Sequence, residues 1–418
     1  MAEQQNNPRI EPVSATGQQR LASLDFTRGI AVMGILVANI VAFGQPQAAY
    51  FWPGGFLTDH GAVSDGLWVA QFTLIDGKMR GLFTLLFGAG MILFLDRAWA
   101  RGAGRWLQVR RLFWLFVFGY AHYLFVSKTD ILALYATCGL IALLFVKWKP
   151  KTQLLVGIVV YLLGAAKDTA VWGMIYANET GRMAAMAAEM RDAGLADGRV
   201  ETELIRAGDY GDWVTYNVAE HWSQPLMAWF QNGLETVPLI LIGMALYRFG
   251  LFDGRLDRGR QALWGWIGLL VGLAGTLAIG LWNYSEGLSY MGGLWSFDGL
   301  WALPGLPMII GLAALLALWG PHATGWLGTR ISAAGRMAFS NYLGTSILML
   351  FVFHGWALGL YGELTRPALY GVVLVTWAIM LIWSPAWLAR YRFGPLEWLW
   401  RCLTYMRIFP IRREREPG

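Results

Sequence analysis

Ten long apolar stretches limit the fold of this chain more than any other feature of its sequence. A helix that crosses the apolar core of a bilayer needs about 20 apolar residues. Only 14% of the 418 residues are charged, against roughly 25% in an ordinary soluble domain. This composition excludes a soluble globular enzyme, a fibrous protein and a disordered chain, and the continuous apolar runs disfavour a porin-type barrel. We predict an all-α, polytopic membrane protein with about ten transmembrane helices, at 26–45, 81–97, 112–127, 131–146, 154–175, 233–250, 263–283, 300–319, 337–358 and 369–388.

The distribution of basic residues predicts the orientation of these helices. Lys and Arg collect in the loops on the cytoplasmic side of a membrane. With ten spans and both termini inside, 24 of the 33 Lys and Arg fall on the inner side and 8 on the outer side, while Lys167 lies within a span. We therefore predict that both termini are cytoplasmic. The net charge of +6 reflects this bias, so we expect no nucleic-acid partner.

A long central loop separates the apolar stretches into two groups of five. Within this loop, residues 182–191 have high helix propensity, which indicates an amphipathic helix on the outer leaflet or, alternatively, a lid over an outward-facing cavity. The predicted parts are a cytoplasmic tail (1–25), a first transmembrane bundle (26–175), the external loop (176–232), a second transmembrane bundle (233–390), and an interfacial helix with a basic cytoplasmic tail that contacts membrane lipids (391–418).

Polar and ionisable residues gather in the outer half of the predicted bundle. An ionisable side chain inside a span costs roughly 2.5–3.5 kcal/mol, so each one requires a partner or a function. A water-filled pocket that opens outward would explain the group as a whole. Its members, in or beside the spans, are Asn39, His60, Lys78, Arg80, His122, Asp130, Lys167, Asp168 and His354.

Several of these residues also have a purely structural interpretation. Lys78 and Arg80 can extend to lipid headgroups, and His354 can be a packing residue. Lys167 and Asp168 are adjacent and point about 100° apart on a helix, so we predict that they pair with other helices and not with each other. His122 is the strongest functional candidate, because it is a titratable imidazole inside a span and is followed by Lys128, Asp130 and Tyr135.

Other chemistries lack their sequence signatures. No His or Cys residues have the spacing of zinc ligands, so we expect no metal. The chain has neither a phosphate-binding Gly-rich loop nor a Gly-x-Ser-x-Gly elbow. Its many glycines favour close helix packing instead, and Gly-rich helix faces would permit a homodimer.

Six stretches of the chain form an ordered series of motifs. They are Leu24 to Ala31 continuing to Asn39, Gly77 to Gly88, Arg110 to Leu112 with Gly119 and His122, Asp130 to Leu132 with Tyr135, Gly335 to Ala338 with Asn341 and Tyr342, and Gly394 to Arg401. Taken in order, they resemble the YeiB-like family of bacterial inner-membrane proteins, whose C-terminal half is domain-of-unknown-function family 418. The resemblance implies that the protein spans the inner membrane of a bacterium.

The first of these stretches also resembles the first helix of transmembrane acyltransferases. Those proteins transfer an acyl group from cytosolic acyl-CoA to an acceptor across the membrane with the help of a histidine. The resemblance carries over Arg28, Gly29 and Asn39, and it places His60 in the loop that holds the histidine of one such enzyme. Many of these relatives end the helix with His where this chain has Asn39.

Two functional hypotheses follow. In the first, the protein is an acyltransferase that uses acyl-CoA as donor and an envelope glycan or another exported molecule as acceptor. His122 or His60 is then the general base, and Asp130 orients the imidazole. Asn39 or Arg80 stabilises the oxyanion. In the second, a secondary transporter binds a small anionic solute. A non-catalytic, lipid-binding scaffold is a third possibility. The substrate-binding candidates are Arg28, Lys78, Arg80, Tyr135, Lys167 and Asp168, of which Asp168, like His122, could couple protons in a transporter.

Overall fold

The computed structural model describes residues 21–58, 61–177 and 181–413, and helices form nearly all of its regular structure. No strand occurs in these ranges, where one isolated bridge joins Tyr391 and Arg412. The predicted all-α class is confirmed. Each predicted stretch coincides with a helix: α1 (Ala22–Gly44), α4 (Lys78–Trp99), α5 (Trp106–Phe125), α6 (Leu132–Leu144), α7 (Pro150–Ala177), α10 (Gln224–Phe249), α11 (Arg258–Ser285), α13 (Ala302–Trp319), α15 (Ala338–Phe353) and α16 (Arg366–Arg390).

The described helices include several that are long and apolar enough to cross a membrane unaided. Six segments meet both conditions, and a seventh does so if α14 (Trp326–Arg336) and α15, which meet at 87°, form one broken span. α6 has 13 residues, fewer than a full crossing needs. The protein is therefore a polytopic helical membrane protein, while the number of ten crossings and the cytoplasmic location of both termini stay predictions.

Helix α3 (Ala62–Leu74) is the largest element that the apolar scan missed. Its residues Trp68 and Phe72 are buried and stacked, with ring centroids 5.4 Å apart, and α3 packs against α11. The chain turns from α3 into α4 at Gly77, whose φ of +74° suits glycine. Asp65, Gly66 and Asp76 interrupt the apolar pattern here, which explains the omission. The other short elements are α2 (Ala48–Phe51), η2 (Pro53–Gly55), α12 (Tyr290–Trp295), the π-helical turn η3 (Ser296–Leu300) and η4 (Gly320–His322).

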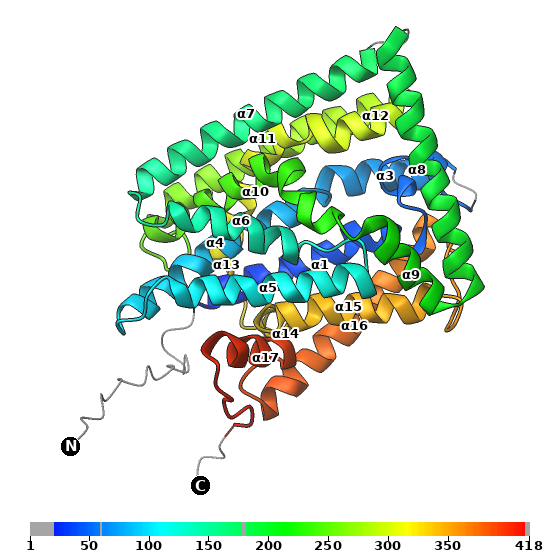
Figure 1. Ribbon diagram of the computed structural model, residues 1–418. Helices are drawn as coiled ribbons and strands as arrows, with labels where there is room; N and C mark the ends of the chain where they lie inside the picture. The colour runs from blue at the N-terminus through cyan, green and yellow to red at the C-terminus, as the bar shows by residue number, and fades with distance from the viewer. Residues whose placement is uncertain (1–20, 59–60, 178–180, 414–418) are drawn as a thin grey trace, which may run out of the picture.

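Helices α8 (Gly181–Ala207) and α9 (Tyr210–His221) cover one end of the bundle, and α8 crosses the helix ends there (Figure 1). Ile205 of α8 is buried against that end, and its carbonyl accepts a hydrogen bond of 2.9 Å from the Gly355 amide. The helix predicted at 182–191 lies within α8. Helix α17 (Pro395–Tyr405) packs on α5 and α15 toward the opposite end. Following the predicted orientation, we name the end under α8 and α9 the outer end and the end beside α17 the inner end.

Glycines allow two pairs of helices to cross with their backbones almost in contact. A Cβ atom added to Gly335 of α14 would lie 1.8 Å from the Asp25 carbonyl oxygen of α1. A Cβ atom added to Gly243 of α10 would lie 2.0 Å from the Leu85 carbonyl oxygen of α4. Such close approach excludes any side chain and increases the van der Waals contact between helices.

We expect Gly335→Ala to lower the free energy of unfolding in detergent by about 1–3 kcal/mol, because overpacking forces α1 and α14 apart. The matched control is Gly344→Ala in α15, where an added Cβ meets nothing within 4 Å. Alanine has the higher helix propensity, so the control should be neutral or slightly stabilising. Equal effects of the two substitutions would contradict the close crossing.

Candidate functional site

His122 and Asp130 form a buried pair at the turn between α5 and α6. His122 Nδ1 lies 2.9 Å from Asp130 Oδ1, and each side chain is about 1% exposed. The other carboxylate oxygen of Asp130 accepts a hydrogen bond of 2.9 Å from the Ala133 amide at the start of α6. Gly119 permits this arrangement, because an added Cβ would lie 2.9 Å from Asp130 Oδ2. We call His122 and Asp130 the dyad.

The dyad leaves one nitrogen of the imidazole available. Asp130 engages Nδ1, and the buried Nε2 atom of His122 has no hydrogen-bond partner in the described part of the chain. A buried polar atom without a partner is costly and often marks a functional site. In this tautomer, with Nδ1 protonated toward the carboxylate, Nε2 can accept a proton.

Tyr342 of α15 joins the dyad to the neighbouring helix. Its ring centroid lies 5.4 Å from that of His122. Its hydroxyl donates to the Thr129 carbonyl at 3.0 Å and accepts from the Ile131 amide at 3.2 Å. Tyr342 thus fixes the backbone on both sides of Asp130.

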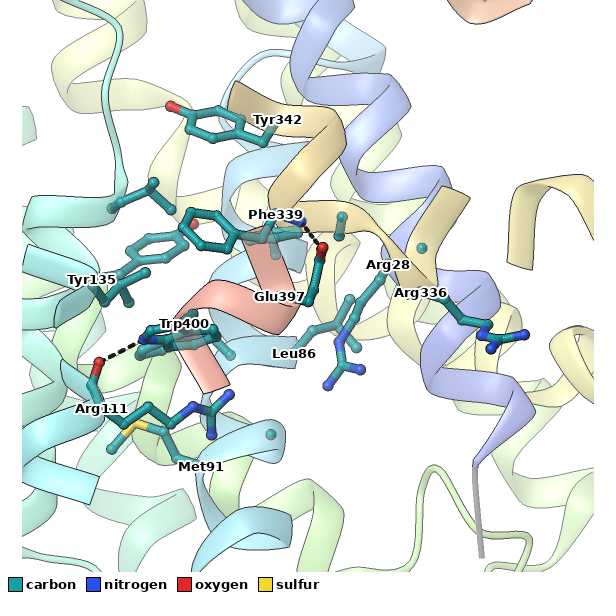
Figure 2. Close-up of a pocket in the computed structure, with 17 residues that line it drawn as sticks. Arg28, Leu86, Met91, Arg111, Tyr135, Arg336, Phe339, Tyr342, Glu397 and Trp400 are labelled. Carbon is teal, nitrogen blue, oxygen red and sulfur yellow. Dashed lines mark hydrogen bonds between the residues drawn. The ribbon is translucent and has the colours of Figure 1, made fainter. Parts of the chain in front are cut away.

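A cavity of about 200 Å³ opens at the inner end and extends toward Tyr342 (Figure 2). Figure 2 shows Tyr342 at one end of the cavity and the guanidinium groups of Arg28 and Arg111 toward the other, while the Arg336 side chain points away from them. Most of the remaining wall is apolar or aromatic. The wall consists of Phe83, Leu86, Phe87, Gly90, Met91, Leu115, Leu132, Tyr135, Gly335, Ala338, Phe339, Glu397 and Trp400. We call this space the inner cavity.

The polar groups at its mouth are held in place by α17. The Arg111 guanidinium lies 4.3 Å from the Trp400 ring, and Trp400 Nε1 donates to the Arg111 carbonyl at 2.8 Å. Glu397 Oε1 accepts hydrogen bonds from the amides of Phe339 (2.9 Å) and Ser340 (3.1 Å) at the start of α15. Burial raises the pKa of Glu397, and these hydrogen bonds oppose that rise. The mouth therefore combines basic groups with a rigid aromatic wall.

A smaller cavity of about 40 Å³ lies at the outer end, beneath α8 and α9. The sequence indicates a water-filled pocket that opens outward, whereas the larger of these two cavities lies at the inner end. We call the smaller one the outer cavity. Its wall consists of Ala42, Phe43, Gln47, Val126, Ser127, Lys128, Thr129, Glu201, Ile205, Trp213, Ser346, Met349, Leu350, His354 and Tyr361.

Lys128, in the α5–α6 turn, attaches α8 to the bundle. Its Nζ atom lies 3.2 Å from Glu201 Oε1 and 3.8 Å from Asp197 Oδ2. Asp197 also accepts hydrogen bonds from His221 Nε2 (3.1 Å) and from the Tyr216 hydroxyl. The hydrogen bonds from His221 and Tyr216, together with the Lys128 charge, hold the pKa of Asp197 well below its usual range.

We expect Asp197→Asn to lower the melting temperature in detergent at pH 6, with a difference from wild type that narrows below about pH 4. A depressed pKa stabilises the fold above the ordinary Asp value of about 3.9, and this contribution is lost as the pH falls further. Other titratable groups surround the Asp197 carboxylate, namely Lys128, Glu201, His221 and Tyr216. The quantity to follow is therefore the difference in melting temperature between wild type and Asp197→Asn at each pH. Asp192→Asn, on the exposed side of α8, is the control and should have no such effect. A constant difference from pH 3 to 7 would contradict this assignment.

Lys78 and Arg80 have different surroundings although they are two residues apart. Lys78 is fully buried, donates to the Phe72 carbonyl and lies 5.6 Å from the Trp301 ring, so it does not extend to headgroups. Arg80 binds Glu235 at 2.8 Å. Tyr135 lines the inner cavity, and its hydroxyl donates to the Arg80 carbonyl at 3.0 Å.

The prediction that Lys167 and Asp168 would not pair with each other is wrong. Lys167 Nζ lies 2.8 Å from Asp168 Oδ1, and the lysine side chain is 50% exposed. The 100° offset of neighbouring helical residues applies to their Cβ atoms, while a long lysine side chain bends back to reach its neighbour. Each of these two charges therefore has its partner in the neighbouring residue.

The remaining candidates are dispersed. Arg28 lines the inner cavity and forms an ion pair with Asp25 at 3.7 Å. Asn39 is half-buried on α1, and its side chain makes no hydrogen bond within the described ranges. His60 lies outside the described residues. His354 is buried, lines the outer cavity and packs against Trp213 with ring centroids 5.2 Å apart.

Sequence reasoning did not select several residues that the structure places around the inner cavity. Arg111, Arg336, Tyr342, Glu397 and Trp400 belong to four separate segments. Each of them stands within a stretch that carried the family resemblance, so those stretches were the available signal.

The fold and the cavities define a class: an all-α, polytopic membrane protein with a buried His–Asp pair between two end cavities. Residues 246–407 match the family described as protein of unknown function (DUF418). The chain is 32% identical to the uncharacterized protein YeiB of Escherichia coli (strain K12), over 92% of this chain and 96% of that protein. It is 29% identical to the uncharacterized protein YxaH of Bacillus subtilis (strain 168), over 95% of this chain and 97% of that protein. No solved structure matches the chain. The chain belongs to the YeiB family.

Proposed function

We propose that this protein is an acyltransferase of the bacterial inner membrane that takes an acyl group from acyl-CoA at the inner end. The observation that carries the proposal is the inner cavity, which has the guanidinium groups of Arg28 and Arg111 at one end and Tyr342, in contact with His122, at the other. The resemblance of the first helix to transmembrane acyltransferases also supports it.

The inner cavity has the chemistry that an acyl-CoA requires. Guanidinium groups bind phosphate oxygens in a bidentate manner, and Arg28 and Arg111 offer two of them on the same side of the cavity. A volume of about 200 Å³ is too small for a whole CoA ester, so we infer that the acyl end enters and the nucleotide stays near the arginines. The apolar residues Phe83, Leu86 and Leu115 would surround the acyl chain.

The dyad would act as a general base in the transfer step. The acceptor oxygen forms a bond to the thioester carbonyl carbon, and His122 Nε2 takes the proton from that oxygen. Asp130 stabilises the resulting imidazolium through Nδ1. The carbon–sulfur bond then breaks, and the leaving thiolate takes the proton from His122, which gives free CoA and an acylated acceptor.

Stabilisation of the oxyanion needs a donor near the dyad. Arg80 is bound to Glu235, and neither Arg80 nor Asn39 makes a hydrogen bond to the dyad in the described ranges. We therefore assign this role to the Tyr342 hydroxyl, whose single proton now bonds the Thr129 carbonyl and would have to turn from that carbonyl to the oxyanion.

The experiment uses the purified full-length protein. Binding of acetyl-CoA is measured by the change in tryptophan fluorescence, and transfer is measured with radiolabelled acetyl-CoA and a bacterial envelope extract. We expect saturable binding and incorporation of label into the extract. The absence of both, with acetyl-CoA and with longer acyl-CoAs, would reject the proposal.

A secondary transporter is the second candidate, because two cavities lie on either side of the layer that contains the dyad. Such an arrangement also suits alternating access, with His122 as the proton-coupling group. Uptake of labelled anions into proteoliposomes that depends on a pH gradient, without acyl transfer, would favour this alternative.

A further inference from the structure

The walls of the two end cavities are in direct contact. Thr129 lines the outer cavity, and its carbonyl accepts the hydrogen bond from Tyr342, which lines the inner cavity. The next residue along the chain, Asp130, belongs to the dyad. A molecule in the outer cavity would therefore lie on the opposite side of the dyad from the donor.

We propose that the outer cavity is the acceptor site, that it takes a hydroxyl-bearing, oxygen-rich molecule, and that α8 and α9 are the lid that admits this molecule. The inference rests on the proposed function, in which the acceptor must reach His122 without crossing the inner cavity. It assigns the acceptor to the outer end of the bundle.

The polar atoms of the outer cavity favour an oxygen-rich ligand. Trp213 is 3% exposed, and its Nε1 donor has no hydrogen-bond partner in the described structure. Lys128 Nζ is buried and lies 3.2 Å from Glu201. Ser127 and Thr129 share a hydrogen bond of 2.8 Å between their hydroxyls. One unsatisfied donor (Trp213 Nε1), two hydroxyls beside an aromatic ring, and a lysine that can exchange a carboxylate partner for a ligand suit the hydroxyl oxygens of a polyol.

The volume of the outer cavity requires the lid to move. About 40 Å³ accommodates one or two water molecules and no larger acceptor, because a water molecule occupies about 30 Å³ of liquid. The closure combines the burial of Ile205 and Trp213 in an apolar cluster with polar contacts. The polar contacts, Lys128 with Glu201 and Arg206 with Glu363 at 2.8 Å, can be replaced by water. Gly208, with φ of +80°, joins α8 to α9 and can serve as a hinge.

One pair of positions allows the lid to be locked. A Cβ atom added to Gly198 of α8 would lie 3.6 Å from the Pro46 Cβ, just beyond the end of α1. Disulfides have Cβ–Cβ distances of about 3.5–4.5 Å, so Pro46→Cys with Gly198→Cys should oxidise to a bond that holds α8 closed. The native Cys138 and Cys402 are buried, which limits side reactions.

Access to the outer cavity can be measured without any transfer activity. Ser346 is 2% exposed and lines this cavity, so the Ser346→Cys thiol should react with a membrane-impermeant maleimide when the lid opens. In the chain that carries all three substitutions, we expect oxidation to slow labelling at least tenfold and dithiothreitol to restore it. Glucose, as a polyol probe, should slow labelling in the reduced protein, whereas cyclohexanol should not. Chains with a single lid cysteine are the controls and should not respond to oxidation.

The outcomes separate this inference from the proposed function. Equal labelling of the oxidised and reduced proteins, failure of the cysteine pair to oxidise, or no protection by glucose would overturn the inference even if acetyl transfer occurs. In the protein that carries Pro46→Cys and Gly198→Cys but keeps Ser346, oxidation should abolish transfer and leave acetyl-CoA binding unchanged. If the wild-type protein binds no acyl-CoA, but the protein with all three cysteine substitutions shows the expected labelling pattern, the acyltransferase proposal is rejected and the outer binding site is kept.

Discussion

Replacing His122 with alanine is expected to reduce acyl transfer by about 10²- to 10⁴-fold, which is the usual contribution of a general base. The expected loss is in the rate of transfer. Binding of acetyl-CoA should stay within about twofold of wild type, because His122 does not line the inner cavity. The measurements are transfer of labelled acetyl groups and tryptophan fluorescence on the same preparation.

Two further variants make this result specific to the dyad. Asp130→Asn should retain binding and lose transfer strongly, since the imidazole would lose the carboxylate that stabilises its charged form. His322→Ala is the control, because this histidine lies in the short η4 turn, is exposed, and lines neither cavity. Transfer that survives in His122→Ala would assign the base to another residue.

Replacing Arg111 with alanine is expected to weaken acetyl-CoA binding about ten- to a hundredfold. A hydrogen bond to a charged group contributes about 1.5–3 kcal/mol, and a tenfold change in affinity corresponds to about 1.4 kcal/mol. The Arg111 guanidinium lies between the rings of Phe94 and Trp400, at 4.6 Å and 4.3 Å, so its orientation is fixed before the ligand arrives. Lysine should not restore full affinity, since it lacks the planar fork that stacks and binds in a bidentate manner.

Arg110→Ala is the matched control, because Arg110 is the neighbouring residue of α5 and does not line the inner cavity. Its dissociation constant should equal that of wild type. The affinity of wild type should fall with added salt, and that of Arg111→Ala should fall less steeply. Identical affinities of the two variants would place the nucleotide end of the donor elsewhere.

The sequence was sufficient to predict the fold class and the positions of the long helices, because apolar length and helix geometry are local properties. It failed at α3, where two aspartates and a glycine conceal a buried helix that packs through Trp68 and Phe72. It also left open whether 182–191 lies on the membrane or covers the bundle. That choice depends on tertiary contacts such as the hydrogen bond between Gly355 and Ile205.

The candidate site was predictable only where the chain itself brings residues together. His122 and Asp130 meet because a short turn reverses the chain between them. Arg28, Arg111 and Arg336 come from three separate helices, and no spacing in the sequence could show that they surround one cavity. The pairing of Lys167 with Asp168 was missed for a different reason. The 100° offset between neighbouring helical residues describes the backbone, and it does not limit where a flexible lysine side chain can reach.

The thin layer formed by Tyr342, Thr129 and the dyad also has to be a seal. A potential of about 100 mV drives each elementary charge across a membrane with about 2.3 kcal/mol, and water on both sides of so thin a layer would offer protons and ions a short path. The hydrogen bonds of Tyr342 with Thr129 and Ile131 hold the backbone of the α5–α6 turn in place, so that water and ions do not pass there. The same few residues would therefore preserve the electrochemical gradient of the cell while chemistry proceeds across them.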